Sequence, residues 1–275
     1  MKEKLTARQI REKEYYDQFA VQNTINEQID FSPIEGPLFN NERRPWNSYW
    51  RTYEVAVDLA EKLKKPNYQP TLLDFGCGAG DNSIRFARAG FNITGFDISE
   101  NNIKSCKQLF EKNDIEADFR VSVAEELPFQ DESFDMVAGI DILHHVDIPA
   151  SIKEVRRVLK KNGIAVFREP LEAALFDSLR NTKLVLKFFP NTASLEAHIT
   201  EDERKLNNHD LEVLREVFPD IRIERSLILA RFDRFFRKLS DPKPSILEKM
   251  DFSISRLIPF YSKLGGAAVI IMKKN

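Results

Sequence analysis

Three glycines at alternate positions, Gly76, Gly78 and Gly80, follow a short apolar stretch that contains Asp74. Glycine has no Cβ, so the chain can turn tightly there and a ligand can approach the backbone closely. In open parallel α/β sheets, a strand, a glycine turn and a helix build a cofactor site at the carboxyl end of the first strand. The pattern therefore predicts a cofactor site within residues 71–82.

The spacing of these glycines disfavours a nicotinamide dinucleotide. The dinucleotide fingerprint G-x-G-x-x-G, counted from Gly76, requires a glycine where the chain has Asp81, and this carboxylate would repel a pyrophosphate. A ligand with a positive centre and no phosphate fits better. The next expected strand, 92–97, ends in Asp97, whose carboxylate can accept hydrogen bonds from a ribose diol. Alternatively, Asp97 caps the following helix, a task that Ser99 can also perform.

Five short sequence blocks follow one another between residues 70 and 170. They are Asp-Phe-Gly-Cys-Gly-Ala-Gly (74–80), Gly-Phe-Asp-Ile-Ser (95–99), Ala-Glu-Glu-Leu-Pro-Phe (124–129), Leu-His-His-Val (143–146) and Glu-Val-Arg-Arg-Val-Leu-Lys-Lys-Asn-Gly (154–163). In this order they resemble the motifs of the class I S-adenosylmethionine-dependent methyltransferases. Within that family they are most similar to the small-molecule branch, such as the quinone-biosynthesis methyltransferases.

This resemblance implies S-adenosyl-L-methionine as the cofactor. The glycine turn would approach the methionine tail and the ribose, and Asp74 would orient that turn or reach the ammonium group. The resemblance also implies that Asp97 accepts the ribose hydroxyls and that Ile98 packs on the adenine. Gly139 and Ile140, at the end of the fourth expected strand, would meet the methionine end through their backbone.

The adenine-reading positions depart from the family pattern at one residue. Ala124 and Glu125 match these positions, but Val123 stands where the family usually has an acid. A valine side chain cannot accept a hydrogen bond from the adenine amino group. We therefore expect Glu125 to accept it instead.

Two adjacent histidines, His144 and His145, follow the fourth expected strand. Methyl transfer to an oxygen or carbon nucleophile often requires removal of a proton, and the ordinary pKa of histidine suits that role. We expect one of them to be the general base, with His145 favoured because the similar branches more often carry histidine there. Alternatively, one histidine only packs against the next helix, and Asp141 is a second candidate base. Residues 168–170 could face the substrate, and no metal site is expected because adjacent histidines point in different directions.

The core alternates between expected strands and helices, which predicts a mostly parallel sheet with helices on both faces. The strands are expected at 71–75, 92–97, 117–122, 135–140 and 163–168, and the helices at 82–89, 99–113 and 148–160. Further on, Asn208 is the expected cap of a helix through Phe218, and 221–229 reads as a strand. The resemblance adds an antiparallel last strand. The predicted fold is a Rossmann-like doubly wound α/β sheet with a helical substrate cap.

This interpretation divides the chain into six segments. The first, 1–65, would be a helical segment that closes over the site, although its aromatic residues could simply pack on the sheet edge. The others are the S-adenosylmethionine-binding core (66–170), a cap insertion (171–207), a core helix and strand (208–229), a second cap insertion (230–263) and the last core strand (264–275).

Composition limits the partners and the compartment. The net charge of -2 over 275 residues gives no general attraction to nucleic acid. Cys77 and Cys106 alone suggest no disulfide framework, and the charged first residues resemble no signal peptide, so a cytoplasmic location is expected. The basic amphipathic stretch 231–239 is a candidate for contact with a membrane surface, or a cap helix with a solvated basic face.

The sequence therefore predicts an S-adenosylmethionine-dependent methyltransferase that acts on an O, N or C atom of a small, hydrophobic or lipid-like molecule. One alternative is a non-catalytic or divergent S-adenosylmethionine-binding protein. Another is a protein or nucleic-acid methyltransferase, which the absence of an Asn-Pro-Pro-Tyr or Asp-Pro-Pro-Tyr tetrapeptide disfavours.

Overall fold

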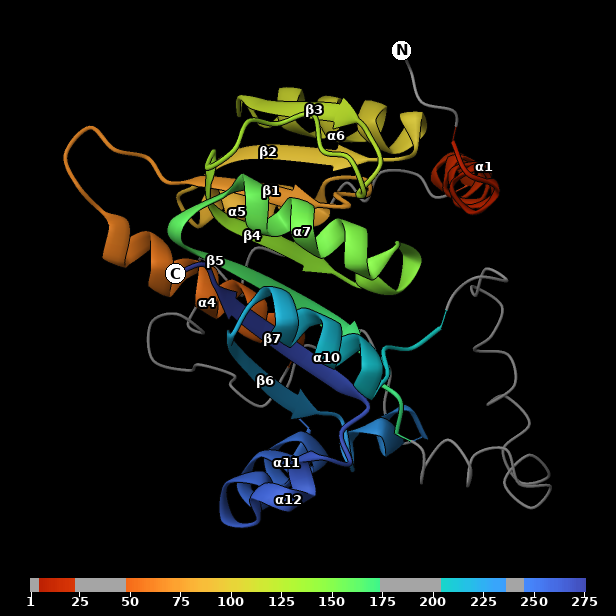
Figure 1. Cartoon of the computed structure of the whole chain (residues 1–275), viewed down its shortest axis with the longest axis vertical. Helices are drawn as coiled ribbons and strands as arrows, with labels where there is room; N and C mark the ends of the chain where they lie inside the picture. The colour runs from red at the N-terminus through yellow and green to blue at the C-terminus, as the bar shows by residue number, and fades with distance from the viewer. Residues whose placement is uncertain (1–4, 23–47, 174–203, 236–244) are drawn as a thin grey trace.

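A computed structural model of the chain describes residues 5–22, 48–173, 204–235 and 245–275. In these ranges, strands form one seven-stranded sheet in the order β3-β2-β1-β4-β5-β7-β6 (Figure 1). The strands are β1 Thr71–Phe75, β2 Asn92–Asp97, β3 Ala117–Val121, β4 Phe134–Ile140, β5 Leu159–Pro170, β6 Asp220–Ser226 and β7 Ala267–Lys273. All neighbouring pairs from β3 to β5 are parallel, and β7 is antiparallel to both of its neighbours. The doubly wound sheet with an antiparallel last strand is thus confirmed.

Strand β5 is longer than the predicted 163–168 because pairing extends it at both ends. Leu159 pairs with Phe134 of β4, and Pro170 pairs with Ala267 of β7. Neither partner is adjacent in the sequence, so a local pattern could not reveal these extensions.

Two boundaries after residue 207 differ from the prediction for local reasons. Strand β6 ends at Ser226 because Leu227 has a φ of 64°, in the left-handed region, and the predicted extension to 229 is wrong. The cap of α10 (Asn208–Val217) is Asn207 rather than Asn208. Asn207 and Asp210 exchange side chain-to-backbone hydrogen bonds in a capping box, which fixes the start of the helix.

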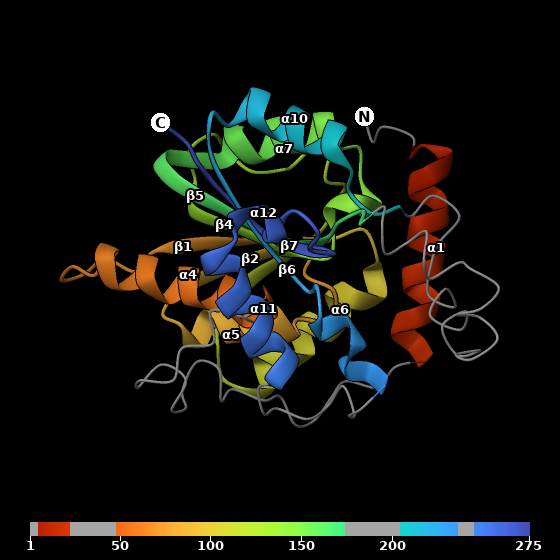
Figure 2. The same ribbon diagram turned by 90° about the horizontal axis from the view of Figure 1, so that it is seen from below.

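Helices cover both faces of the sheet (Figures 1 and 2). One face carries α4 (Ser48–Leu63), α5 (Asp81–Arg88) and α6 (Glu100–Lys112), and the other carries α7 (Ile148–Val158) and α10. Successive side chains of a strand point to opposite faces. Leu72 therefore joins the buried cluster that contains Phe86 of α5, whereas Leu73 joins the cluster that contains Val155 of α7.

Helix α1 (Ala7–Gln22) lies outside these layers, beside the carboxyl ends of the strands (Figure 2). One carboxylate, that of Asp17, attaches it to the start of α6. Asp17 Oδ1 accepts a hydrogen bond of 2.6 Å from Ser99 Oγ, and the Asp17 carbonyl accepts one of 3.1 Å from Asn101 Nδ2. Lys13 Nζ lies 2.8 Å from Asp17 Oδ2. Burial raises the pKa of Asp17, but the bonds from Lys13, Ser99 and Asn101 outweigh it and hold this pKa below its ordinary value.

The elements beyond β6 include α11 (Ile246–Leu257) and α12 (Pro259–Ser262), which extend past the β6 edge of the sheet (Figure 1). The described part of the predicted basic helix 231–239 is a 3-10 helix, Ala230–Phe235. Arg231 Nη2 donates a 3.0 Å bond to the Leu227 carbonyl, so this side chain is already engaged. Most of the first predicted cap insertion lies outside the described residues. Among the described helices, none combines the length and the apolar character needed to span a bilayer.

Replacement of Asp17 should loosen α1 while leaving the sheet intact. Asp17→Ala removes hydrogen bonds to an ionised group, each worth about 1.5–3 kcal/mol. Amide hydrogen exchange in residues 7–22 should therefore accelerate about tenfold or more, with exchange in β4 and β5 unchanged. Asp118→Ala, on the exposed side of β3, is the matched control. Equal exchange in α1 of the wild type and Asp17→Ala would contradict the anchoring role.

Candidate active site

A cleft of about 950 Å³ opens between α1 and the carboxyl ends of β1, β2 and β4. Small-molecule sites span roughly 300–1,000 Å³, so this cleft has room for a cofactor beside a small second ligand. The predicted site residues that line it are Gly76, Gly78, Asp97, Ile98, Ala124, Glu125, Ile140 and His145. Those that do not line it are Asp74, Gly80, Gly139 and His144.

The three glycines of the turn serve different purposes. Gly78 has a φ of 53°, and a Cβ there would have no protein atom within 4 Å, so its backbone is open to a ligand. At Gly76 a Cβ would lie 2.6 Å from the Ile142 side chain, and at Gly80 it would lie 3.1 Å from Cys106 Sγ. Gly76 and Gly80 therefore permit close packing of the chain, and Gly78 provides the open backbone.

Asp97 connects the glycine turn to the start of α6. Its Oδ2 accepts a 2.9 Å hydrogen bond from the Gly78 N–H, and its Oδ1 accepts bonds from the Ser99 N–H (2.9 Å) and Asn102 Nδ2 (3.2 Å). Ser99 is the N-cap of α6, so the alternative that Asp97 caps this helix is wrong. Burial raises the pKa of Asp97, and these three hydrogen bonds oppose that rise. Asp97 thus presents an almost buried carboxylate to the cleft.

Two predicted cofactor residues lie behind the cleft wall. Asp74 is buried and accepts a 2.5 Å hydrogen bond from Ser83 Oγ, which ties β1 to α5. Burial, with a smaller contribution from Asp97, raises the pKa of Asp74 to about 7. Of its two predicted roles, this position favours orienting the turn over direct contact with the ammonium group. Gly139 makes room for the Phe167 ring, which would lie 2.6 Å from a Cβ at that position.

Glu125 already has protein partners on both carboxylate oxygens. Its Oε2 accepts a 2.9 Å bond from Gln9 Nε2 of α1, and its Oε1 accepts a 2.9 Å bond from the Asp147 N–H. Each carboxylate oxygen can accept a second bond, so the predicted bond to adenine stays a prediction. Ala124 and the nearby Val123 give this part of the cleft an apolar wall.

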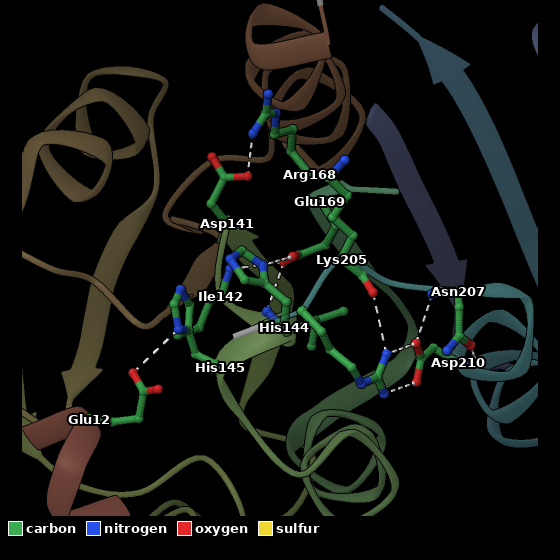
Figure 3. A network of polar contacts seen from close by, with 12 residues as sticks. Glu12, Asp141, Ile142, His144, His145, Arg168, Glu169, Lys205, Asn207 and Asp210 are labelled. Carbon is green, nitrogen blue, oxygen red and sulfur yellow. Dashed lines mark hydrogen bonds and ion pairs between the residues drawn. The ribbon is translucent and has the colours of Figure 1, made fainter. Parts of the chain in front are cut away.

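The rings of the two adjacent histidines lie side by side, with centroids 4.2 Å apart, but they meet different partners (Figure 3). His144 Nδ1 lies 2.7 Å from Glu169 Oε2, and both side chains are buried. Glu169 Oε1 also accepts hydrogen bonds from the Ile142 and Leu143 N–H groups, at 2.9 and 2.8 Å. Glu169 therefore holds the loop after β4, and the prediction that Glu169 faces the substrate is wrong. His144 does not line the cleft.

His145 lines the cleft and meets two side chains of α1. It ends the 3-10 helix Leu143–His145, and its Nε2 lies 3.0 Å from the Tyr16 hydroxyl. Its Nδ1 lies 3.3 Å from Glu12 Oε2, and both side chains are almost fully buried (Figure 3). The general-base candidate thus lies between a phenol and a carboxylate.

Sequence reasoning did not identify Glu12 and Tyr16 as site residues, although a signal was present. Gln9, Glu12, Tyr16 and Phe19 recur at spacings of three and four, so they share one face of a helix, and all of them line the cleft. A buried stripe is normally apolar throughout. Polar members in such a stripe indicate a wall of a site rather than core.

The other candidate base, Asp141, forms an ion pair with the Arg168 guanidinium. Asp141 lines the cleft, whereas Arg168 does not. His145 is therefore the better-placed base. Of the remaining polar residues, His209 is exposed on α10, and Glu196 and His198 lie outside the described residues.

The strand order, with its antiparallel β7, is that of the class I methyltransferase fold. Residues 73–167 match a family model described as a methyltransferase domain. Residues 73–167 therefore form a methyltransferase domain, for which S-adenosylmethionine is the implied methyl donor.

Curated relatives and a solved structure agree with this assignment. A ubiquinone biosynthesis O-methyltransferase of Pelagibacter ubique is 34% identical over 54% of this chain and 65% of its own length. A demethylmenaquinone methyltransferase of Chlorobaculum parvum is 32% identical over 46% of this chain and 50% of its own length. The chain thus spans less than two thirds of these relatives. Geranyl diphosphate C-methyltransferase from Streptomyces coelicolor A3(2) shares the fold, with a TM-score of 0.57, 15% identity and 99% of each chain covered.

The buried Asp74 makes stability depend on pH. Because its pKa rises from 3.8 to about 7, the folded chain keeps a proton that the unfolded chain loses in this range. The contribution of Asp74 to stability is therefore greatest at low pH within this range and falls as the pH rises, by up to about 1.4 kcal/mol per unit. The side chain in Asp74→Asn cannot ionise. The free energy of unfolding of this variant should therefore increase relative to that of the wild type as the pH rises from about 4 to 7. Urea unfolding across this range measures the gap, and a constant gap would contradict this cause.

Proposed function

We propose that the protein transfers a methyl group from S-adenosylmethionine to a small molecule, with His145 as the general base. One observation carries this proposal: Gly78, Asp97 and His145 line the same cleft, although they come from the turn after β1, the end of β2 and the 3-10 helix after β4. A cofactor-binding turn and a proton acceptor in one cavity are what methyl transfer to a hydroxyl requires.

The residues of the cleft fit the cofactor. Gly78 offers an open backbone for close approach, and Asp97 is placed to accept from a ribose diol. Ile98 and Val123 supply apolar contact for a base. Asp81, in the first turn of α5, suits the positive methionine end and disfavours a pyrophosphate. When bound, the cofactor supplies an electrophilic methyl group at a sulfonium centre.

His145 is arranged to accept a proton. Its Nε2 faces the Tyr16 hydroxyl, so a proton from an acceptor hydroxyl reaches Nε2 through the phenol, which passes its own proton to Nε2 and takes the acceptor's. The Glu12 carboxylate, 3.3 Å from Nδ1, stabilises the imidazolium that results. Glu169 holds the loop that carries His145 without entering the cleft.

The acceptor end of the cleft suits a hydrophobic molecule with a hydroxyl group. The apolar lining of the cleft includes Val146, next to His145 in the sequence, together with Leu5 and Phe19, which precede and follow the polar residues of α1. The relatives that act in ubiquinone and menaquinone biosynthesis support a phenolic quinone precursor as the first acceptor to test.

Calorimetry tests the cofactor. S-adenosylmethionine and its demethylated product should bind, and NAD should not, because Asp81 opposes a pyrophosphate. Asp97→Ala should weaken binding about tenfold to a hundredfold through the loss of hydrogen bonds to a carboxylate. Asp118→Ala is the control for loss of an exposed carboxylate. Heat with NAD but none with S-adenosylmethionine would overturn the proposal.

Turnover separates the two histidines. His145→Ala should lower single-turnover methylation of a phenolic acceptor about 10²–10⁴-fold while cofactor affinity stays nearly unchanged, because the proton moves only in the reaction. His144→Ala should lower the melting temperature instead, because it removes the His144 ring from Oε2 of the buried Glu169. His209→Ala, on the exposed surface of α10, is the control. Wild-type rates in His145→Ala would show that the acceptor needs no base from His145.

A further inference from the structure

The outer side of α11 and α12 exposes large apolar side chains. We call these side chains the α11–α12 face: Ile246, Met250, Leu257, Ile258 and Phe260. Leu257 is 83% exposed, Ile246 77% and Phe260 68%. These exposed fractions are high for large apolar side chains, and the residues are neighbours on one segment. A contiguous apolar patch on a protein surface marks a site of interaction.

The fold holds this face toward solvent. At about 100° per residue, Ile246, Met250 and Leu257 lie within about 40° of one another around α11. Asp251, on another side of α11, is buried and accepts hydrogen bonds of 2.8–3.0 Å from the N–H groups of residues 228–230. Because this carboxylate is anchored inward, α11 cannot rotate to bury its apolar stripe.

The charges beside the face are basic. Lys249, Arg256 and Lys263 are exposed. The two acids between residues 245 and 263 are engaged elsewhere: Glu248 bonds the Ser245 N–H in a capping box, and Asp251 is buried. The three exposed cations outnumber the one partly exposed carboxylate, Glu248, so this segment presents a net positive charge around an apolar centre.

We propose that the α11–α12 face docks on an anionic lipid bilayer, with its apolar side chains in the headgroup layer and the basic residues on lipid phosphates. An exposed apolar stripe with basic flanks is what interfacial amphipathic helices use to lie on such membranes. A two-fold pairing of two copies through this face would bring like charges together, which disfavours self-association. None of these residues lines the cleft, so docking leaves it accessible.

Vesicle sedimentation of the full chain tests this surface. The wild type should bind vesicles of phosphatidylcholine with phosphatidylserine, and Leu257→Glu/Phe260→Glu should lose at least about tenfold of that binding. Arg256→Gln/Lys263→Gln should lose about fivefold per charge, the fold-change of about 1 kcal/mol for each basic residue near an anionic surface. Binding by this second variant should become less sensitive to removal of phosphatidylserine than that of the wild type, with Lys249 retained.

The controls separate docking from folding and from the proposed function. Ile10→Glu places a new charge on an exposed apolar position of α1 and should bind vesicles like the wild type. All variants should keep the wild-type melting temperature and affinity for S-adenosylmethionine, so failure here leaves the proposed function standing. The proposal is overturned if the wild type stays in the supernatant, or if Leu257→Glu/Phe260→Glu binds equally. Loss of a wild-type dimer in that variant, without vesicle binding, would instead assign the face to self-association.

Discussion

The cleft depends on one constraint: a carboxylate buried at the carboxyl end of a strand must be hydrogen bonded. Asp97 meets it by binding the N–H groups of the glycine turn and of the start of α6. Glu169 meets it by binding two N–H groups of the loop after β4 and the ring of His144. The backbone N–H groups of these loops have few hydrogen-bond partners within the loop. The bonds to Asp97 and Glu169 therefore hold each loop in one conformation. The cleft is the space that the fixed loops enclose.

Helix α1 supplies the other half of the site. The carboxyl ends of the strands and the segments that follow them contribute the glycine turn, Asp97 and His145. Glu12 and Tyr16 reach His145 from α1, which packs outside the helix layers on the two faces of the sheet. Asp17 attaches this helix to the N-cap of α6, next to the residue that would hold the ribose. The contact between Asp17 and the start of α6 therefore positions both the residue that would hold the ribose and the helix that carries Glu12 and Tyr16. Any motion of α1 changes both the access to the cleft and the environment of His145.

Local sequence patterns correctly predicted the structural features that depend on residues close together in the sequence. The bounds of β1 and β2, the capping role open to Ser99 and the open backbone at Gly78 all follow from local patterns. What these patterns could not predict depends on contacts between distant segments. No residue near His144 in the sequence indicates that the His144 ring contacts Glu169 and does not line the cleft. Nothing places Cys77 Sγ 3.6 Å from Cys106 Sγ, where both remain free thiols.

Strand order also sets an order of assembly. Among the described strands, β6 pairs only with β7, and β7 pairs with β5 across about a hundred intervening residues, as at Pro170 and Ala267. During synthesis, β1 to β5 can pair with one another as soon as they emerge. β6 has no strand to join until residues 267–273 have been made, and its free edge stays open for that time. The half of the sheet that carries the cofactor turn can thus form first, and β6 is added last.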